Sequence, residues 1–154
     1  MKSTAIKATL TIVVMAFSAM HATTAYAHEL TFKSLTGGAQ ATDVWQVSCT
    51  SEPLENPPES FRFAFQIRDK FAGASKMSAV VLKDGQASTT TDIASGDVGY
   101  SDFAYVNGGN GLYTIIVNHT LAAGFDFYDL QYHCENVNGA HTGTLDPDFP
   151  IQDQ

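Results

Sequence analysis

The sequence predicts an all-β protein, an antiparallel β-sandwich of about eight strands with one disulfide bond. Short runs of β-forming residues recur at fairly even spacing, separated by Gly, Asn, Asp and Pro, and no amphipathic helix pattern follows residue 28. In several runs apolar and polar side chains alternate, which is typical of strands with one face on a core and one in water. Cys49 and Cys134 both fall on the apolar parity of their runs.

Residues 1–27 have the layout of a secretory signal peptide. Lys2 and Lys7 precede an apolar run over 8–20, and small residues at 25 and 27 predict cleavage after Ala27. We therefore expect an exported protein, periplasmic or extracellular, that begins at His28. Since no second apolar stretch of membrane length follows, we expect no membrane insertion after processing.

The mature part, 28–154, is about 127 residues long, the size of one domain, with an irregular Gly-, Asp- and Pro-rich tail from about residue 138. Its charge is strongly negative. The whole chain has 16 acidic and 8 basic residues, a net charge of −8, and loss of Lys2 and Lys7 with the leader would make the balance −10. Such an acidic chain is a poor candidate for nucleic acid, and the excess charge keeps an exported protein soluble.

The first expected strand of the mature chain is 44–49. Trp45, Val47 and Cys49 share one face of it. The segment 52–60 that follows contains three prolines and three glutamates, so we expect a solvated loop there rather than a central strand.

The run 61–68 has the clearest alternation in the chain. Phe61, Phe63, Phe65 and Ile67 share one face, and two arginines lie on the other. We expect the four apolar side chains to point into the core.

Two hairpins and a final strand follow. Asp84-Gly85 tolerates positive φ and predicts a two-residue turn, and 108–111, Gly-Gly-Asn-Gly, predicts a second tight connection. The expected strands are 77–83, 86–93, 100–106, 112–118 and 125–134.

The two cysteines are expected to form a disulfide bond, because an even pair in an exported chain is usually bridged. Cys49 shares parity with Trp45, and Cys134 shares parity with Leu130 and Tyr132. Both sulfurs should therefore point inward, as a bridge across the interior of a sandwich requires.

Tyr132-His133-Cys134 places a tyrosine two residues before the second cysteine, which is similar to the tyrosine corner of immunoglobulin domains. The chain departs from that family because Trp45 precedes the first cysteine instead of following it. The resemblance implies only the architecture, a sandwich of jelly-roll or immunoglobulin-like type.

The stretch 109–117, Gly-Asn-Gly-Leu-Tyr-Thr-Ile-Ile-Val, followed by a strand from Phe125, resembles the prepeptidase C-terminal domains of bacterial secreted proteins. Those domains are small β-sandwiches. The resemblance covers about 43–134 and implies a binding or accessory module without chemistry of its own.

No catalytic motif is found. GxSxG, HExxH and the phosphate-binding GxxxxGK are missing, so we expect a protein that is not an enzyme. Its partner would be an unknown protein or a glycan. Phe125 and Phe127 alternate opposite to Tyr128 and Leu130, which makes them candidate surface aromatics for stacking on such a partner.

The histidines suggest a competing function. The mature chain contains His28, His119, His133 and His141. An N-terminal histidine can chelate copper through its α-amine and Nδ1, and a second histidine completes three nitrogen ligands that suit Cu(II). The chain is similar in this respect to histidine-brace copper proteins. By parity His133 points away from the core and His141 lies in a loop, so we take His28, His133 and His141 as candidate ligands and copper as the candidate cofactor.

The sequence thus leaves two functions open. One is a non-catalytic binding or accessory module, and the other is a periplasmic or secreted copper-binding protein built on His28. Titration of Cu(II) into the mature protein, with and without one extra alanine before His28, separates them.

Overall fold

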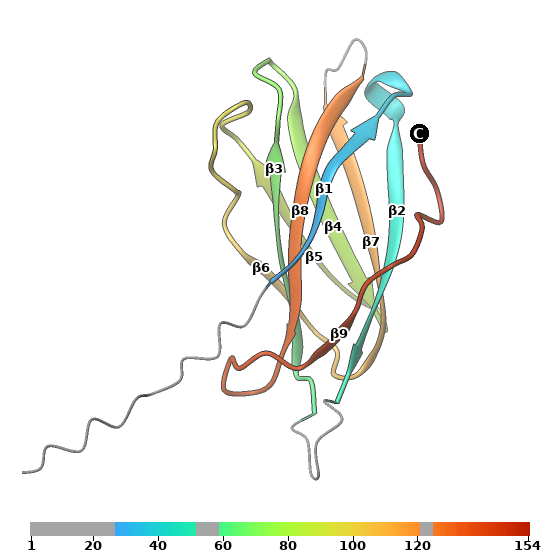
Figure 1. Ribbon diagram of the computed structural model, residues 1–154, viewed down its shortest axis with the longest axis vertical. Helices are drawn as coiled ribbons and strands as arrows, with labels where there is room; N and C mark the ends of the chain where they lie inside the picture. The colour runs from blue at the N-terminus through green and yellow to red at the C-terminus, as the bar shows by residue number, and fades with distance from the viewer. Residues whose placement is uncertain (1–26, 52–58, 121–124) are drawn as a thin grey trace, which may run out of the picture.

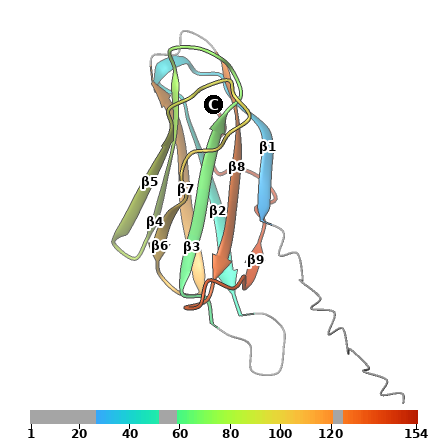
Figure 2. The ribbon, with the colours of Figure 1, turned by 90° about the vertical axis from the view of Figure 1, so that its left-hand side faces the viewer.

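The computed structural model describes residues 27–51, 59–120 and 125–154, and these form two antiparallel sheets packed face to face (Figures 1 and 2). The predicted β-sandwich is confirmed. The predicted signal peptide, apart from Ala27, and most of the proline-rich loop lie outside the described residues. The strands are β1 (His28–Leu35), β2 (Thr42–Thr50), β3 (Arg62–Asp69), β4 (Lys76–Lys83), β5 (Gln86–Asp92), β6 (Ala104–Asn107), β7 (Gly111–Thr120), β8 (Asp126–Glu135) and β9 (Gly143–Leu145).

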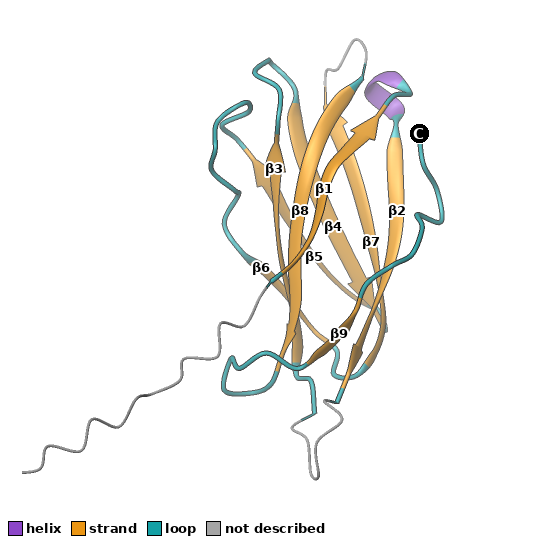
Figure 3. Ribbon diagram, in the orientation of Figure 1, coloured by secondary structure: helices purple, strands orange, loops and turns teal. Residues whose placement is uncertain are grey.

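One sheet has the strand order β1-β8-β3-β6 and the other β5-β4-β7-β2-β9. A single 3-10 turn, Gly38–Gln40, connects β1 to β2 in the part of the chain that the structure describes (Figure 3). Among these residues, no helix is long and apolar enough to cross a membrane. The outer faces of the two sheets therefore form the two broad surfaces of the molecule.

Aromatic rings from both sheets meet in the core. Phe63 of β3 stacks on Tyr132 of β8 in its own sheet and on Tyr113 of β7 in the other, with ring centroids 5.8 and 4.9 Å apart. All three side chains are fully buried. Offset stacking adds to the hydrophobic gain of burying three large rings.

A buried hydrogen-bond chain also joins the sheets. The Trp45 Nε1–H donates to the Tyr128 hydroxyl at 2.8 Å, and that hydroxyl donates to Asp43 Oδ2 at 2.7 Å. Burial and the neighbouring Asp43 raise the pKa of Tyr128, so this hydroxyl remains a donor. The one tryptophan of the chain thus has its polar atom satisfied inside the core.

The predicted disulfide is confirmed. Cys49 of β2 is bonded to Cys134 of β8, with Cα atoms 5.6 Å apart, and so links the two sheets through the interior. Both cysteines are buried on the inner faces, as strand parity predicted.

Three local predictions need revision. Phe61 is 44% exposed and precedes β3, so it does not share the core with Phe63. Of the expected strand 100–106, only 104–106 pairs, and the strand continues to Asn107. The tail from residue 138 contributes β9 and a bridge from Gln152 to Val44. The expected turn at Asp84-Gly85 is present, with φ values of 48° and 79°.

Candidate metal site on the outer face of the four-stranded sheet

A tight turn after β8 brings His141 back beside this strand. The Asn136 side-chain oxygen accepts hydrogen bonds from the backbone N–H groups of Asn138 and Ala140. The backbone N–H of Asn136 donates to the carbonyl of Ala140 at 2.8 Å. His141 then forms an isolated bridge with Glu135. Residues 133, 135 and 141 consequently share the outer face, because Glu135 follows His133 by two residues on a strand.

His133, Glu135 and His141 form one cluster. We call its two imidazoles, His133 and His141, the histidine pair. The two imidazole rings are stacked with centroids 3.9 Å apart and an interplanar angle of 15°. Each residue offers one ligand atom, and these atoms all lie within 4.8 Å of one another. Glu135 Oε1 lies 2.6 Å from His133 Nε2, and its Oε2 accepts from Arg62 Nε at 2.5 Å.

The hydrogen bond to Glu135 fixes which nitrogen of the His133 ring bears a proton. Nε2–H donates to the Glu135 carboxylate, so in the neutral tautomer Nδ1 has the free lone pair. This Nδ1 is buried and has no hydrogen-bond partner. Burial, followed by the charge of His133, lowers the pKa of His141, while Glu135 opposes the shift. His141 is therefore neutral at neutral pH, with a lone pair of its own.

Aromatic side chains lie beside the site on the β6 side. Phe103 contacts His133 edge-on with centroids 5.6 Å apart, and Tyr105 lies under the Arg62 guanidinium at 4.2 Å. Ala64, fully buried, is the strand neighbour of His133 on β3. This packing holds the His133 ring in one orientation on a rigid sheet.

His28, the third predicted ligand, lies at the start of the neighbouring strand. It pairs with Tyr132, on which its ring stacks at 6.0 Å, and its Nδ1 lies 2.7 Å from Asp146 Oδ1. Its charge contributes to the lowered pKa of His141. The structure therefore brings His133 and His141 into contact on the outer face, whereas the His28 side chain lies on the side of the sheet that carries Tyr132, with Nδ1 beside an acid.

Two members of the site were not singled out from the sequence. Glu135 has the same parity as His133, so the pattern His-x-Glu already placed both on one face. Arg62 could not be found in that way, because its approach to Glu135 depends on the register in which β3 pairs with β8.

Phe125 and Phe127, the predicted surface aromatics, belong to a cluster of four phenylalanines at the other end of this sheet. Phe127 contacts Phe32, Phe71 and Phe125 with centroids 5.4, 5.3 and 5.6 Å apart. Phe125 is 64% exposed, whereas Phe127 is half-buried. Phe32 reaches the cluster from a bulge in β1, where its φ is 54°.

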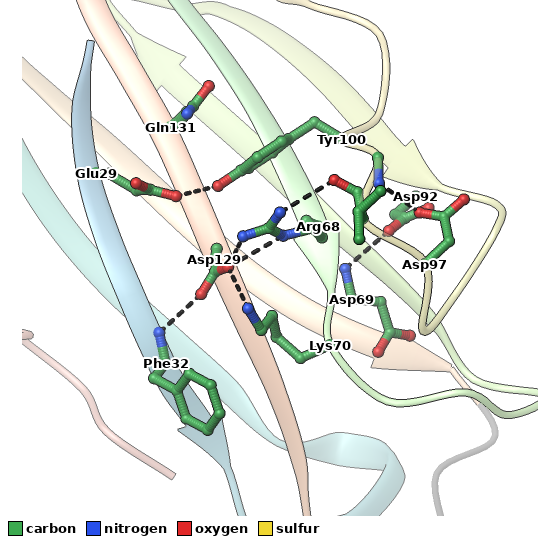
Figure 4. A network of polar contacts seen from close by, with 12 residues as sticks. Glu29, Phe32, Arg68, Asp69, Lys70, Asp92, Asp97, Tyr100, Asp129 and Gln131 are labelled. Carbon is green, nitrogen blue, oxygen red and sulfur yellow. Dashed lines mark hydrogen bonds and ion pairs between the residues drawn. The ribbon is translucent and has the colours of Figure 1, made fainter. Parts of the chain in front are cut away.

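Between the two clusters, the outer face carries an ion network centred on Asp129 (Figure 4). Its carboxylate accepts from Arg68, from Lys70 Nζ at 2.8 Å and from the Phe32 N–H at 2.8 Å. Burial alone would raise the pKa of Asp129, but these three donors outweigh it and lower the pKa. The network is satisfied internally and explains the backbone position of Phe32.

His119, the remaining histidine of residues 28–154, is buried inside one end of the sandwich. Its Nε2–H donates to the Gly38 carbonyl at 2.6 Å, and Nδ1 lies 3.7 Å from Asp126 Oδ2. It is remote in the fold from the histidine pair because it ends β7 in the other sheet.

A comparison of the chain with protein-family models, with curated proteins and with solved structures finds no match. The function proposed below therefore rests on the geometry of the histidine pair and its surroundings.

Proposed function

We propose that this protein is exported and binds a divalent transition metal, copper(II) in the first place, at His133 and His141. The observation that carries the proposal is the cluster of His133, Glu135 and His141, whose ligand atoms lie within 4.8 Å of one another, together with a buried Nδ1 of His133 that has no hydrogen-bond partner. Imidazole nitrogens suit copper and zinc, and copper(II) binds a given nitrogen site most tightly of the first-row divalent metals.

The contacts around His133 support a ligand role. A carboxylate that accepts a hydrogen bond from the second nitrogen of a metal-binding histidine fixes its tautomer and raises its basicity. Glu135 stands in that relation to His133, and Arg62 in turn holds Glu135. Because the pKa of His141 is lowered, little proton competition opposes metal binding there at neutral pH.

The N-terminal brace predicted from the sequence is a distinct arrangement at the same edge. It would use the α-amine and Nδ1 of His28 after removal of the leader, and Nδ1 would first have to leave Asp146. The two arrangements differ in their dependence on a free amine, which makes them separable by experiment.

The test is a calorimetric titration of copper(II) into the mature protein and three variants. We expect His141→Ala to weaken binding by at least about 10-fold through loss of a ligand. His28→Ala, a matched histidine control, and a form with one extra alanine before His28 should bind like the wild type. Unchanged binding by His141→Ala would refute the site, and loss of binding in the extended form would favour the brace instead.

A second candidate is the non-catalytic binding or accessory module that resembles prepeptidase C-terminal domains. The exposed part of the phenylalanine cluster favours it, since aromatic rings stack on sugars and on protein side chains. A glycan array probed with the wild type and with Phe125→Ala tests this candidate. Reproducible binding that the variant loses supports it, and an array without reproducible signals removes the glycan partner.

Export to the periplasm or the medium is proposed on the leader pattern, and an inter-sheet disulfide is consistent with an oxidising compartment. The N-terminal sequence of the protein recovered from its host tests this directly. A mature chain that begins at His28 agrees with the proposal, and a chain that retains its leader contradicts it.

A further inference from the structure

The outer face of the five-stranded sheet differs in character from the face that carries the histidine pair. A row of four side chains crosses the middle of this face, one from each of four neighbouring strands. The row consists of Thr89 (β5), Val80 (β4), Ile116 (β7) and Val44 (β2). Their side chains are β-branched and point away from the core, because residues one position along each strand are buried. Thr89 is exposed and the other three are half-buried.

This face is almost free of charge. Among the outward positions of β2, β4, β5 and β7, all of which lie in the described chain, Lys76 is the only charged residue. The two acids of these strands, Asp43 and Asp92, point inward and are buried. The chain as a whole has a net charge of −8, so the acidic surface lies elsewhere.

Apolar side chains are exposed at the β4–β5 hairpin end of the same face. Leu82 is 38% and Leu112 is 49% exposed. Both side chains point to the outer face of the sheet. Leu82 is paired with Thr114, and Leu112 is paired with Ser48, on the neighbouring strand. The uncharged row therefore continues into an apolar corner.

We propose that this face pairs with the same face of a second copy of the chain. Two copies of an acidic chain repel each other where their acidic groups come close. Because this face carries no acidic side chain on the described strands, the repulsion between two copies is weakest when these faces meet. A pairing of identical faces is closed by a two-fold axis, and flat sheets with β-branched side chains pack face to face about 10 Å apart.

The size of the face reaches the lower limit for a specific dimer. Four strands of seven to ten residues cover roughly 19 Å by 28 Å at the usual strand spacing and rise. Two copies would bury about 1,100 Å² in total, above the roughly 1,000 Å² expected of a specific interface. The histidine pair lies on the opposite sheet, so the dimer does not cover it.

Sedimentation equilibrium of the mature protein tests the proposal. We expect a dimer in the wild type and, in Ile116→Lys, a dissociation constant raised at least about 30-fold, because a charge enters the centre of the interface. Val98→Lys is the matched control, since Val98 is exposed in the loop between β5 and β6 and should leave the dimer unchanged. The urea midpoint of each variant monitors folding, and Thr114→Lys on the same face replaces Ile116→Lys if that variant unfolds.

Two results would overturn the proposal. One is a wild type that remains monomeric at about 100 μM, far above the micromolar constants of functional dimers. The other is a dimer that withstands lysine on this face, which would place the interface on another surface.

Discussion

Asp69 should make the stability of this protein depend on pH in a way opposite to most carboxylates. It lies fully buried at the end of β3, where its Oδ2 has no hydrogen-bond partner. Burial, then the charges of Asp126 and Asp92, raise its pKa from 3.8 to about 6, and the hydrogen bond from the Phe71 N–H opposes the shift. Ionisation of Asp69 therefore costs more in the folded than in the unfolded chain.

The size and sign follow from proton linkage. A shift from 3.8 to about 6 corresponds to about 3 kcal/mol, since one pKa unit is worth about 1.4 kcal/mol. Because the folded pKa is the higher one, the favourable contribution is complete below pH 3.8 and is lost as the pH rises through about 6. We expect Asp69→Asn to be more stable than the wild type by up to about 3 kcal/mol at pH 7.5 and by less than about 1 kcal/mol at pH 4.

Urea unfolding of wild type and Asp69→Asn at steps between pH 4 and 7.5 measures this difference. Asparagine keeps an oxygen for the Phe71 N–H, so the local turn is retained. Asp129→Asn is the control of opposite sign, because the pKa of Asp129 is lowered and its contribution is lost as the pH falls. A stability difference for Asp69→Asn that stays constant with pH, or that grows on acidification, would refute the reasoning.

Three further predictions concern the packing of the sandwich. Replacing Cys49 and Cys134 together by serine should lower the free energy of unfolding by about 4 kcal/mol in urea, since the bond closes a loop of 85 residues, and an unchanged midpoint would contradict this. Phe63→Ala should cost about 3 to 5 kcal/mol, because the buried ring lies between two tyrosines; a loss under 1 kcal/mol on the same assay would show that the core closes over the gap. Gly96→Ala should lower the thermal midpoint, because φ is +80° and an added Cβ would lie 2.4 Å from the Ala72 nitrogen; an unchanged midpoint would mean that this contact relaxes freely.

The core of this fold could be predicted because alternation in the sequence reports directly on burial. Phe63, Phe65 and Ile67 are buried as their parity requires, and the cysteines meet for the same reason. Phe61 has the same parity but precedes the strand, where its carbonyl accepts from the N–H groups of the 108–109 turn. Parity gives the side of a strand, but it does not give the point at which the opposing sheet ends.

No bounds could be predicted for β1 because its pattern is broken. The bulge between Leu30 and Lys33 shifts the register, and Phe32 points outward with positive φ. A bulge places two residues opposite one, so the period of two is lost within a single short strand. The N–H of Phe32 is held by Asp129, a residue 97 positions away, which no local pattern reveals.

In the candidate site too, some features follow from strand parity and others depend on tertiary contacts. The outward direction of His133 follows from its position beside Cys134, whose sulfur must point inward to reach Cys49. The approach of His141 depends on the Asn136 turn, a tertiary detail that loop composition leaves undetermined.

The disulfide and the histidine pair are coupled through one short piece of β8. Cys134 lies between His133 and Glu135, and its carbonyl accepts from the Thr142 N–H next to His141 at 2.8 Å. The bond to Cys49 therefore anchors, from inside, the strand that presents two members of the site outside. Loss of the bond should lower both stability and copper affinity, whereas loss of the His141 ring should lower copper affinity alone. Measuring both quantities on both variants distinguishes a site built on the rigid sheet from histidines that bind metal merely because they are exposed.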